Sequence, residues 1–238
     1  MLKINDANNF RRTALGLCLI AGPLVTIVGG LVSPWEGTET SAGYLQSLSE
    51  NPARWQVSAV LFYFGFLLTA VGVFGMIHLV KHRAVVLANI AGVLAVWGWV
   101  TLPGLLVSNF QDLSLAESLD IQQAVAVSER ALEYVGATIQ SMPVLLGFLG
   151  MALLGVALWR EKVAPVWVPV VLVIGIAADL VPSSVVPPGI NFTVSSGLLF
   201  AGLGYVGLKI LRMSDEEWEH GVPPTSEPVV AKVQPQVR

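Results

Sequence analysis

The stretch that decides the fold is VAPVWVPVVLVIGIAADLVP, residues 163–182, an apolar run whose single charged side chain is Asp179. A helix of about 20 residues rises roughly 30 Å, which matches the hydrocarbon core of a bilayer. Because lipid offers no hydrogen-bond partner to a bare backbone amide, we predict that this run is a transmembrane helix. A turn with two prolines, SSVVPPGIN at residues 183–191, follows it.

Five more runs have spanning length, and none shows the alternating polarity of about ten residues that is typical of barrel strands. We therefore predict an all-α membrane protein built as a six-transmembrane-helix bundle over residues 1–212. The predicted spans are residues 13–32, 56–80, 84–108, 138–159, 163–182 and 191–211. The first run is long for the core of a signal peptide, so we expect it to remain as an uncleaved span.

The composition supports a membrane location and excludes several classes of partner. The chain is 54% hydrophobic and 12% charged, whereas an average soluble domain is about 25% charged. A net charge of −3 does not indicate nucleic-acid binding. The one cysteine, Cys18, excludes an intramolecular disulfide and a cysteine cluster for metal.

The basic residues predict the orientation of the bundle. If the N-terminus is cytoplasmic, 11 of the 13 lysines and arginines fall in inner segments, and only Arg54 and Arg130 fall in outer ones. This positive-inside bias predicts that both termini are cytoplasmic and that the protein lies in the cell membrane. The 11 inner residues are Lys3, Arg11, Arg12, Lys81, Arg83, Arg160, Lys162, Lys209, Arg212, Lys232 and Arg238.

The polar segments outside the spans are acidic on one side. Within residues 109–135, apolar side chains recur at helical spacing, which predicts an amphipathic outer helix that runs into the fourth span. That helix either lies on the bundle as a solvated surface helix or acts as a lid or an acidic funnel for cations. Residues 213–238 are predicted to be a cytoplasmic tail that lacks apolar periodicity and is disordered beyond about Gly221.

Asp179 is the strongest candidate for a functional residue. A carboxylate in hydrocarbon costs several kcal/mol unless it finds a partner, and Arg54 heads the second span at the same level. This pair is either structural or part of a site for a substrate, proton or ion. With Asp179 and Arg54, a set of polar or aromatic side chains is predicted to line a pocket open to the outside: Trp99, Thr101, Asn109 and Gln140.

No sequence motif points to catalysis or to a cofactor. The chain contains no phosphate-binding loop, zinc-protease helix or nucleophile elbow. His78 and His82 have no cysteine or acidic ligand close in sequence, so neither metal nor haem is expected.

The leading functional hypothesis is a non-catalytic bundle that binds or moves a small apolar or amphipathic ligand through a pocket near Asp179. One alternative is an accessory or assembly subunit of a larger membrane complex. Another is an intramembrane enzyme that uses Asp179 as a general acid on a lipid or prenyl substrate. The expected partners are membrane lipid, the ligand, and a membrane protein or a second copy of the chain.

Overall fold

The computed structural model describes residues 6–220, apart from the side chains of residues 105, 137, 138 and 140. Residues 221–238, which include most of the predicted tail, lie outside the described part. The described chain is all-helical and contains no strand. Its nine helices are α1 (Ala7–Val32), α2 (Ser41–Glu50), α3 (Pro52–His78), α4 (Val85–Ser118), α5 (Ile121–Leu132), α6 (Val135–Arg160), α7 (Trp167–Asp179), α8 (Pro188–Arg212) and α9 (Asp215–His220).

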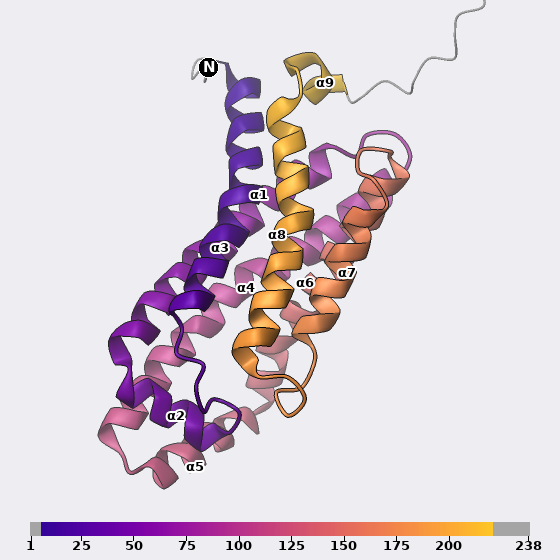
Figure 1. Ribbon diagram of the computed structural model, residues 1–238. Helices are drawn as coiled ribbons and strands as arrows, with labels where there is room; N and C mark the ends of the chain where they lie inside the picture. The colour runs from indigo at the N-terminus through magenta and orange to yellow at the C-terminus, as the bar shows by residue number, and fades with distance from the viewer. Residues whose placement is uncertain (1–5, 221–238) are drawn as a thin grey trace, which may run out of the picture.

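Six of these helices form a closed ring. Around the ring each helix packs on the next in the order α1, α3, α4, α6, α7, α8 and back to α1. The short helices α2 and α5 cover one end of the bundle, and α9 lies at the other end beside the start of α1 (Figure 1). We call these the acidic end, with α2 and α5, and the basic end, with α9. The described parts of the two termini therefore lie at the same end.

Five helices are long and apolar enough to cross a membrane: α1, α3, α4, α8 and the part of α6 from Ser141 to Arg160. The sixth predicted span is shorter than the sequence indicated. α7 has 13 residues, about 20 Å at 1.5 Å per residue, because the apolar run continues into turns on both sides. Pro165 precedes the helix and Pro182 follows it, and a proline lacks the N–H that a helix interior needs.

The acidic end differs from the prediction in three ways. α4 continues to Ser118, ten residues beyond the predicted end of the third span, so its last turns project past the apolar region. The amphipathic outer helix exists as α5, but it ends at Leu132 and α6 starts separately at Val135. α2 was not predicted; the Thr40 hydroxyl caps its start by accepting from the Gly43 amide at 3.1 Å.

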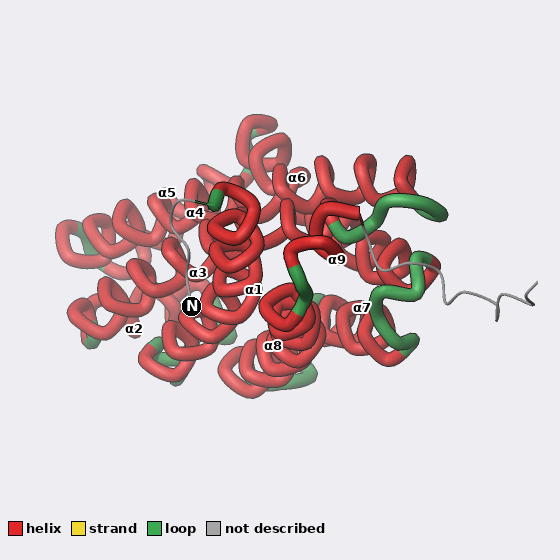
Figure 2. The backbone as a smooth tube through the Cα atoms, turned by 90° about the horizontal axis from the view of Figure 1, so that it is seen from above, coloured by secondary structure: helices red, strands yellow, loops and turns green. Residues whose placement is uncertain are grey.

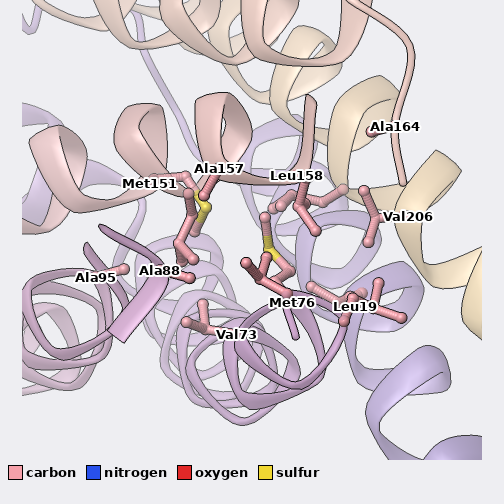
Figure 3. Close-up of a cluster of buried hydrophobic side chains, with 14 of the residues drawn as sticks. Leu19, Val73, Met76, Ala88, Ala95, Met151, Ala157, Leu158, Ala164 and Val206 are labelled. Carbon is pink, nitrogen blue, oxygen red and sulfur yellow. The ribbon is translucent and has the colours of Figure 1, made fainter. Parts of the chain in front are cut away.

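The core of the ring lies in the half nearest the basic end. Fully buried leucines and methionines meet there, among them Leu19, Met76, Met151 and Leu158. They come from α1, α3 and α6, and alanines of α4 lie close beside them (Figure 3). The long helices are thus fixed against one another near the basic end.

Glycines bring the helix backbones into contact where α1 crosses α3. A Cβ atom added to Gly65 would lie 2.3 Å from the Thr26 hydroxyl oxygen and 3.0 Å from the Gly22 carbonyl oxygen. The reciprocal relation holds for Gly22, whose added Cβ would lie 2.4 Å from the Thr69 hydroxyl oxygen. Both threonines donate to the carbonyl four residues earlier, Thr26 to Gly22 at 3.0 Å and Thr69 to Gly65 at 2.9 Å. At the crossing, the positions of Gly22 and Gly65 therefore have room for a hydrogen atom but not for a side chain.

We expect Gly65→Ala to lower the melting temperature of the purified protein, because the new methyl group must push α1 and α3 apart. Such overpacking costs about 1–3 kcal/mol. Gly197→Ala in α8 is the matched control, since nothing lies within 4 Å of its added Cβ. Alanine there should leave the melting temperature unchanged or raise it. Equal effects of the two substitutions would contradict the close crossing.

The positive charges gather at the basic end. Of the ten lysines and arginines in the described part, eight lie on its helix ends and turns: Arg11, Arg12, Lys81, Arg83, Arg160, Lys162, Lys209 and Arg212. α9 folds back over this end, where Arg12 forms an ion pair of 2.8 Å with Asp215. Trp218 of α9 is buried, and its carbonyl accepts hydrogen bonds from Lys81 and, at 2.9 Å, from the His78 ring. The described basic residues that the sequence analysis placed in inner segments thus gather at one end of the bundle.

Glu161 ties two turns of the basic end together. Its carboxylate follows α6 and accepts from the amides of His82 at 2.8 Å and Arg83 at 2.7 Å, in the turn between α3 and α4. Partial burial raises the pKa of Glu161, but these amides, with that of Lys81, outweigh burial and hold the pKa below its ordinary value. The ionised carboxylate is therefore the form that the fold stabilises.

We expect Glu161→Gln to lower the melting temperature at pH 7 and to make less difference in acid. A depressed pKa means that the charged side chain adds stability above its unfolded pKa, about 4.3, and loses it as the pH falls through the lower folded value. The difference in melting temperature between the unmodified protein and Glu161→Gln should therefore disappear as the pH falls below about 4.3. Glu129→Gln, at an exposed position of α5, should have the same melting temperature as the unmodified protein at every pH. A difference that stays constant down to pH 3 would refute the assignment.

Candidate functional site

An apolar groove runs between α3 and α4 in the half of the bundle near the acidic end. Its empty volume is about 560 Å³. Aromatic and branched side chains form its walls, and Pro103 adds an apolar ring on the α4 side. The lining residues are Ala59, Val60, Tyr63, Phe64, Pro103, Leu106, Val107 and Phe110. The groove has the size and the chemistry to hold an alkyl chain.

A smaller, more polar pocket borders the groove on the side of α2. Its empty volume is about 180 Å³, and it shares Ala59 and Phe110 with the groove. The other lining residues are Leu48 of α2, Trp55 and Gln56 of α3, and Asn109 and Leu113 of α4. We call this the head pocket and the apolar part the tail groove. Together they form an amphipathic site, with amide and indole groups at one end and hydrocarbon at the other.

Trp55 lines the head pocket and carries an unpaired donor. Its side chain is 6% exposed, and its indole N–H has no hydrogen-bond partner. Trp35 and Tyr44 hold the ring by edge contacts, with centroids 6.4 and 5.6 Å away. An indole N–H can only donate, and leaving such a group buried and unpaired costs about 1–3 kcal/mol. An acceptor in the head pocket would remove that cost.

Asn109 lies on the other wall of the head pocket, and α2 and α5 orient it. Its carbonyl oxygen accepts from the Tyr44 hydroxyl at 3.4 Å, and Asp112 accepts from the same hydroxyl at 3.5 Å. Ser128 of α5 donates to Asp112 at 3.4 Å. Burial, and then the charge of Asp112, raise the pKa of Tyr44 far above its ordinary value, so its hydroxyl stays a donor. The single hydroxyl proton of Tyr44 is thus shared between Asn109 and Asp112.

The structure separates Asp179 from the other predicted residues. Asp179 is the last residue of α7 and is exposed, and Ser195 of α8 donates a hydrogen bond to it. α7 lies across the ring from α3 and α4 (Figure 2). Arg54 instead donates from Nε to the Val32 carbonyl at 3.1 Å. Arg54 and Asp179 form no ion pair, so the predicted counter-charge is not supplied by this arginine.

The remaining predicted residues are also dispersed. Thr101 donates to the Trp97 carbonyl of its own helix at 2.8 Å. The side chain of Gln140 lies outside the described residues. Of the two tryptophans of α4, Trp97 is 54% exposed and Trp99 is 5% exposed. Of the predicted set, Asn109 alone lines the amphipathic site as described.

Trp99 lines a separate small niche in the centre of the ring. Phe66 and Phe148 flank its ring, with centroids 5.6 and 6.5 Å away, and its indole N–H is unpaired. The niche has an empty volume of about 230 Å³. Its other walls are Pro23, Thr26, Thr69, Ser196, Leu199 and Leu203. Like the head pocket, the niche has a free centre no larger than one water molecule needs, so neither space alone holds an amphiphile.

These apolar helices define a polytopic membrane protein of the helical-bundle class. The chain belongs to the family described as a domain of unknown function (DUF4386), whose profile matches residues 14–210. That match covers the whole ring from the first turns of α1 to the last turns of α8. No curated protein and no solved structure matches the chain.

Sequence reasoning missed Trp55 and Tyr44 for identifiable reasons. A tryptophan at the start of a span, as Trp55 is, is typical of the aromatic belt at the membrane surface, where tryptophan faces lipid headgroups. Tyr44 lies in an acidic segment for which no helix was predicted. The signal that could have found them is the pair of helix starts, Thr40 as a cap for α2 and Pro52 at the start of α3, which together fold the segment over the bundle.

Proposed function

We propose that this protein is a non-catalytic membrane bundle that binds a small amphipathic ligand in the tail groove and head pocket between α3 and α4. The observation that carries the proposal is the apolar groove of about 560 Å³ between α3 and α4, which the head pocket borders. The ligand's chain would lie along Val60, Phe64 and Val107, and its polar group would meet Trp55 and Asn109. Asp179 and Ser195 form a second pair of polar side chains, on the opposite side of the ring from the groove.

We also propose an orientation of the bundle in the membrane. All six ring helices cross the cell membrane, the basic end faces the cytoplasm, and the acidic end faces outward. The gathering of eight basic side chains at one end supports this orientation. The groove then opens to the outer leaflet, from which an amphiphile enters sideways.

We expect single cysteines to report this orientation in a Cys18→Ser background. Glu129→Cys, in exposed α5, should react with a membrane-impermeant maleimide on intact cells. Arg83→Cys, exposed in the turn before α4, should react only after the cells are permeabilised. The reverse pattern would place the groove in the inner leaflet and overturn the orientation.

We expect Val60→Trp to abolish binding by filling the tail groove. The assay is saturable binding of tritiated methyl decanoate to the protein in lipid nanodiscs, and the variant should weaken it at least tenfold. Val57→Trp is the matched control, because Val57 is a similarly exposed valine of α3, 52% against 49%, that does not line the groove. It should bind as the unmodified protein does.

Two results would count against the proposed site. Equal binding by the two valine variants would exclude the groove. Loss of binding in Asp179→Asn with full binding in Val60→Trp would move the site to the α7 side of the ring.

A further inference from the structure

Part of the positive charge at the basic end is not used by the fold. Arg12 pairs with α9, and Lys81 and Lys209 donate to backbone carbonyls. The turns that join α3 to α4 and α6 to α7 carry other basic residues. Their side chains are exposed and make no hydrogen bond or ion pair with the described residues: Arg83, Arg160 and Lys162.

Glu161 brings these three charges together. Its carboxylate accepts from the Arg83 amide at 2.7 Å, and Arg160 and Lys162 are its neighbours in sequence. The carboxylate is satisfied by backbone amides of the α3–α4 turn, so it needs none of the three cationic side chains. We call the two turns joined in this way the paired turns. They present three free cations from one fixed piece of backbone.

Lys162 also has an unusual backbone conformation. Its φ of 63° lies in the left-handed region, and it is the one described residue other than glycine with a positive φ. The turn requires this conformation, because the Lys162 amide donates to the Trp159 carbonyl at 2.9 Å and the Val163 amide donates to the Leu158 carbonyl at 3.0 Å. Glycine is the common residue at such a position after a helix, since a Cβ atom is disfavoured there. Lysine at this position therefore costs stability, and a ligand for its ammonium group would offset that cost.

Exposed apolar side chains lie directly beside the free cations. Trp159 precedes the α6–α7 turn and Trp167 follows it, and they are 45% and 41% exposed. Val86, in the first turn of α4, is 73% exposed. Tryptophan is enriched where headgroups meet hydrocarbon. A free phosphate ion would meet the cations alone, whereas a phospholipid meets the cations with its phosphate and the apolar side chains with its acyl chains.

We propose that the paired turns bind the phosphate group of an anionic phospholipid, with Arg83, Arg160 and Lys162 as its cationic contacts. The proposal rests on the ring helices spanning the membrane and is independent of what the tail groove holds. In the orientation proposed above, this lipid belongs to the cytoplasmic leaflet. Basic side chains at this depth attract anionic lipids, and a choline group on the same headgroup would cancel the attraction.

Native mass spectrometry of the full chain, released from dodecyl maltoside micelles, measures the affinity for the first lipid bound. The two probes are palmitoyl-oleoyl phosphatidylglycerol and phosphatidylcholine, which have the same acyl chains. We expect phosphatidylglycerol to bind about tenfold more tightly, since each basic side chain contributes about fivefold. The preference should fall as the ammonium acetate concentration rises. Inorganic phosphate at the concentration of the lipid should not displace it.

Substitutions in the paired turns separate a binding role from a structural one. Arg160→Gln and Lys162→Gly should each weaken phosphatidylglycerol binding about fivefold. Lys162→Gly should at the same time leave the melting temperature unchanged or raise it, because glycine adopts this backbone conformation without strain. Lys162→Arg, which keeps the charge, should bind as the unmodified protein does. Arg130→Gln, at an exposed position of α5 at the acidic end, is the matched control for the loss of one positive charge and should not change the affinity.

Four results would overturn the proposal. Equal affinities for the two lipids would exclude recognition of the anionic headgroup. Equal weakening by Arg130→Gln and Arg160→Gln would mean that net charge, and not the paired turns, sets the affinity. Displacement by inorganic phosphate would make this a site for a free anion. A fall in melting temperature together with lost binding in Lys162→Gly would make the lysine structural. None of these results bears on the tail groove, which the binding of methyl decanoate tests separately.

Discussion

The close approach of helix backbones is the constraint on which this structure depends. Lipid tails are as apolar as leucine side chains, so burying leucine between helices gains little in a membrane, and close packing must supply the attraction. Gly22 and Gly65 place α1 and α3 in contact, and Gly98 and Gly147 do the same for α4 and α6, where a Cβ added to Gly98 would lie 2.4 Å from the Gly147 Cα. Between these two tight pairs, α3 and α4 are joined through larger side chains. That looser junction is where the tail groove opens.

Polar groups within the bundle are few, and most are used by the fold itself. Thr26, Thr69 and Thr101 each donate to the carbonyl one turn back, and Ser58 donates across the helix pair to Gly29 at 2.9 Å. Against this pattern the two buried tryptophans with unpaired N–H groups, Trp55 and Trp99, are exceptions. The niche beside Trp99 and the pocket beside Trp55 both have free centres of about the size of a water molecule, and only the pocket beside Trp55 borders the groove.

Much of the fold could be predicted from the sequence, because hydropathy and charge act over whole segments. All-helical structure, the long apolar helices and the gathering of lysine and arginine at one end follow from counts of residues along the chain. The length of α7 could not be predicted from the sequence. The turns around Pro165 and Pro182 are as apolar as the helix, and hydropathy does not distinguish them from it. Of the residues that line the tail groove and the head pocket, only Asn109 was predicted from the sequence. The importance of Asp179 was argued from its isolation in the sequence, while the pairing of α3 with α4, which creates the groove, depends on tertiary contacts that no single segment encodes.

The shortness of α7 has a consequence for the bilayer around it. A hydrophobic helix of about 20 Å does not match a hydrocarbon layer of about 30 Å. Such a mismatch is relieved when lipids next to the helix compress or when headgroups and water descend beside it, at a modest cost per ångström. With α7 placed across the bilayer, as we propose, the polar boundary on that flank of the ring comes closer to the bilayer midplane. A carboxylate at the end of so short a helix, such as Asp179, would then keep its hydration without a protein counter-ion.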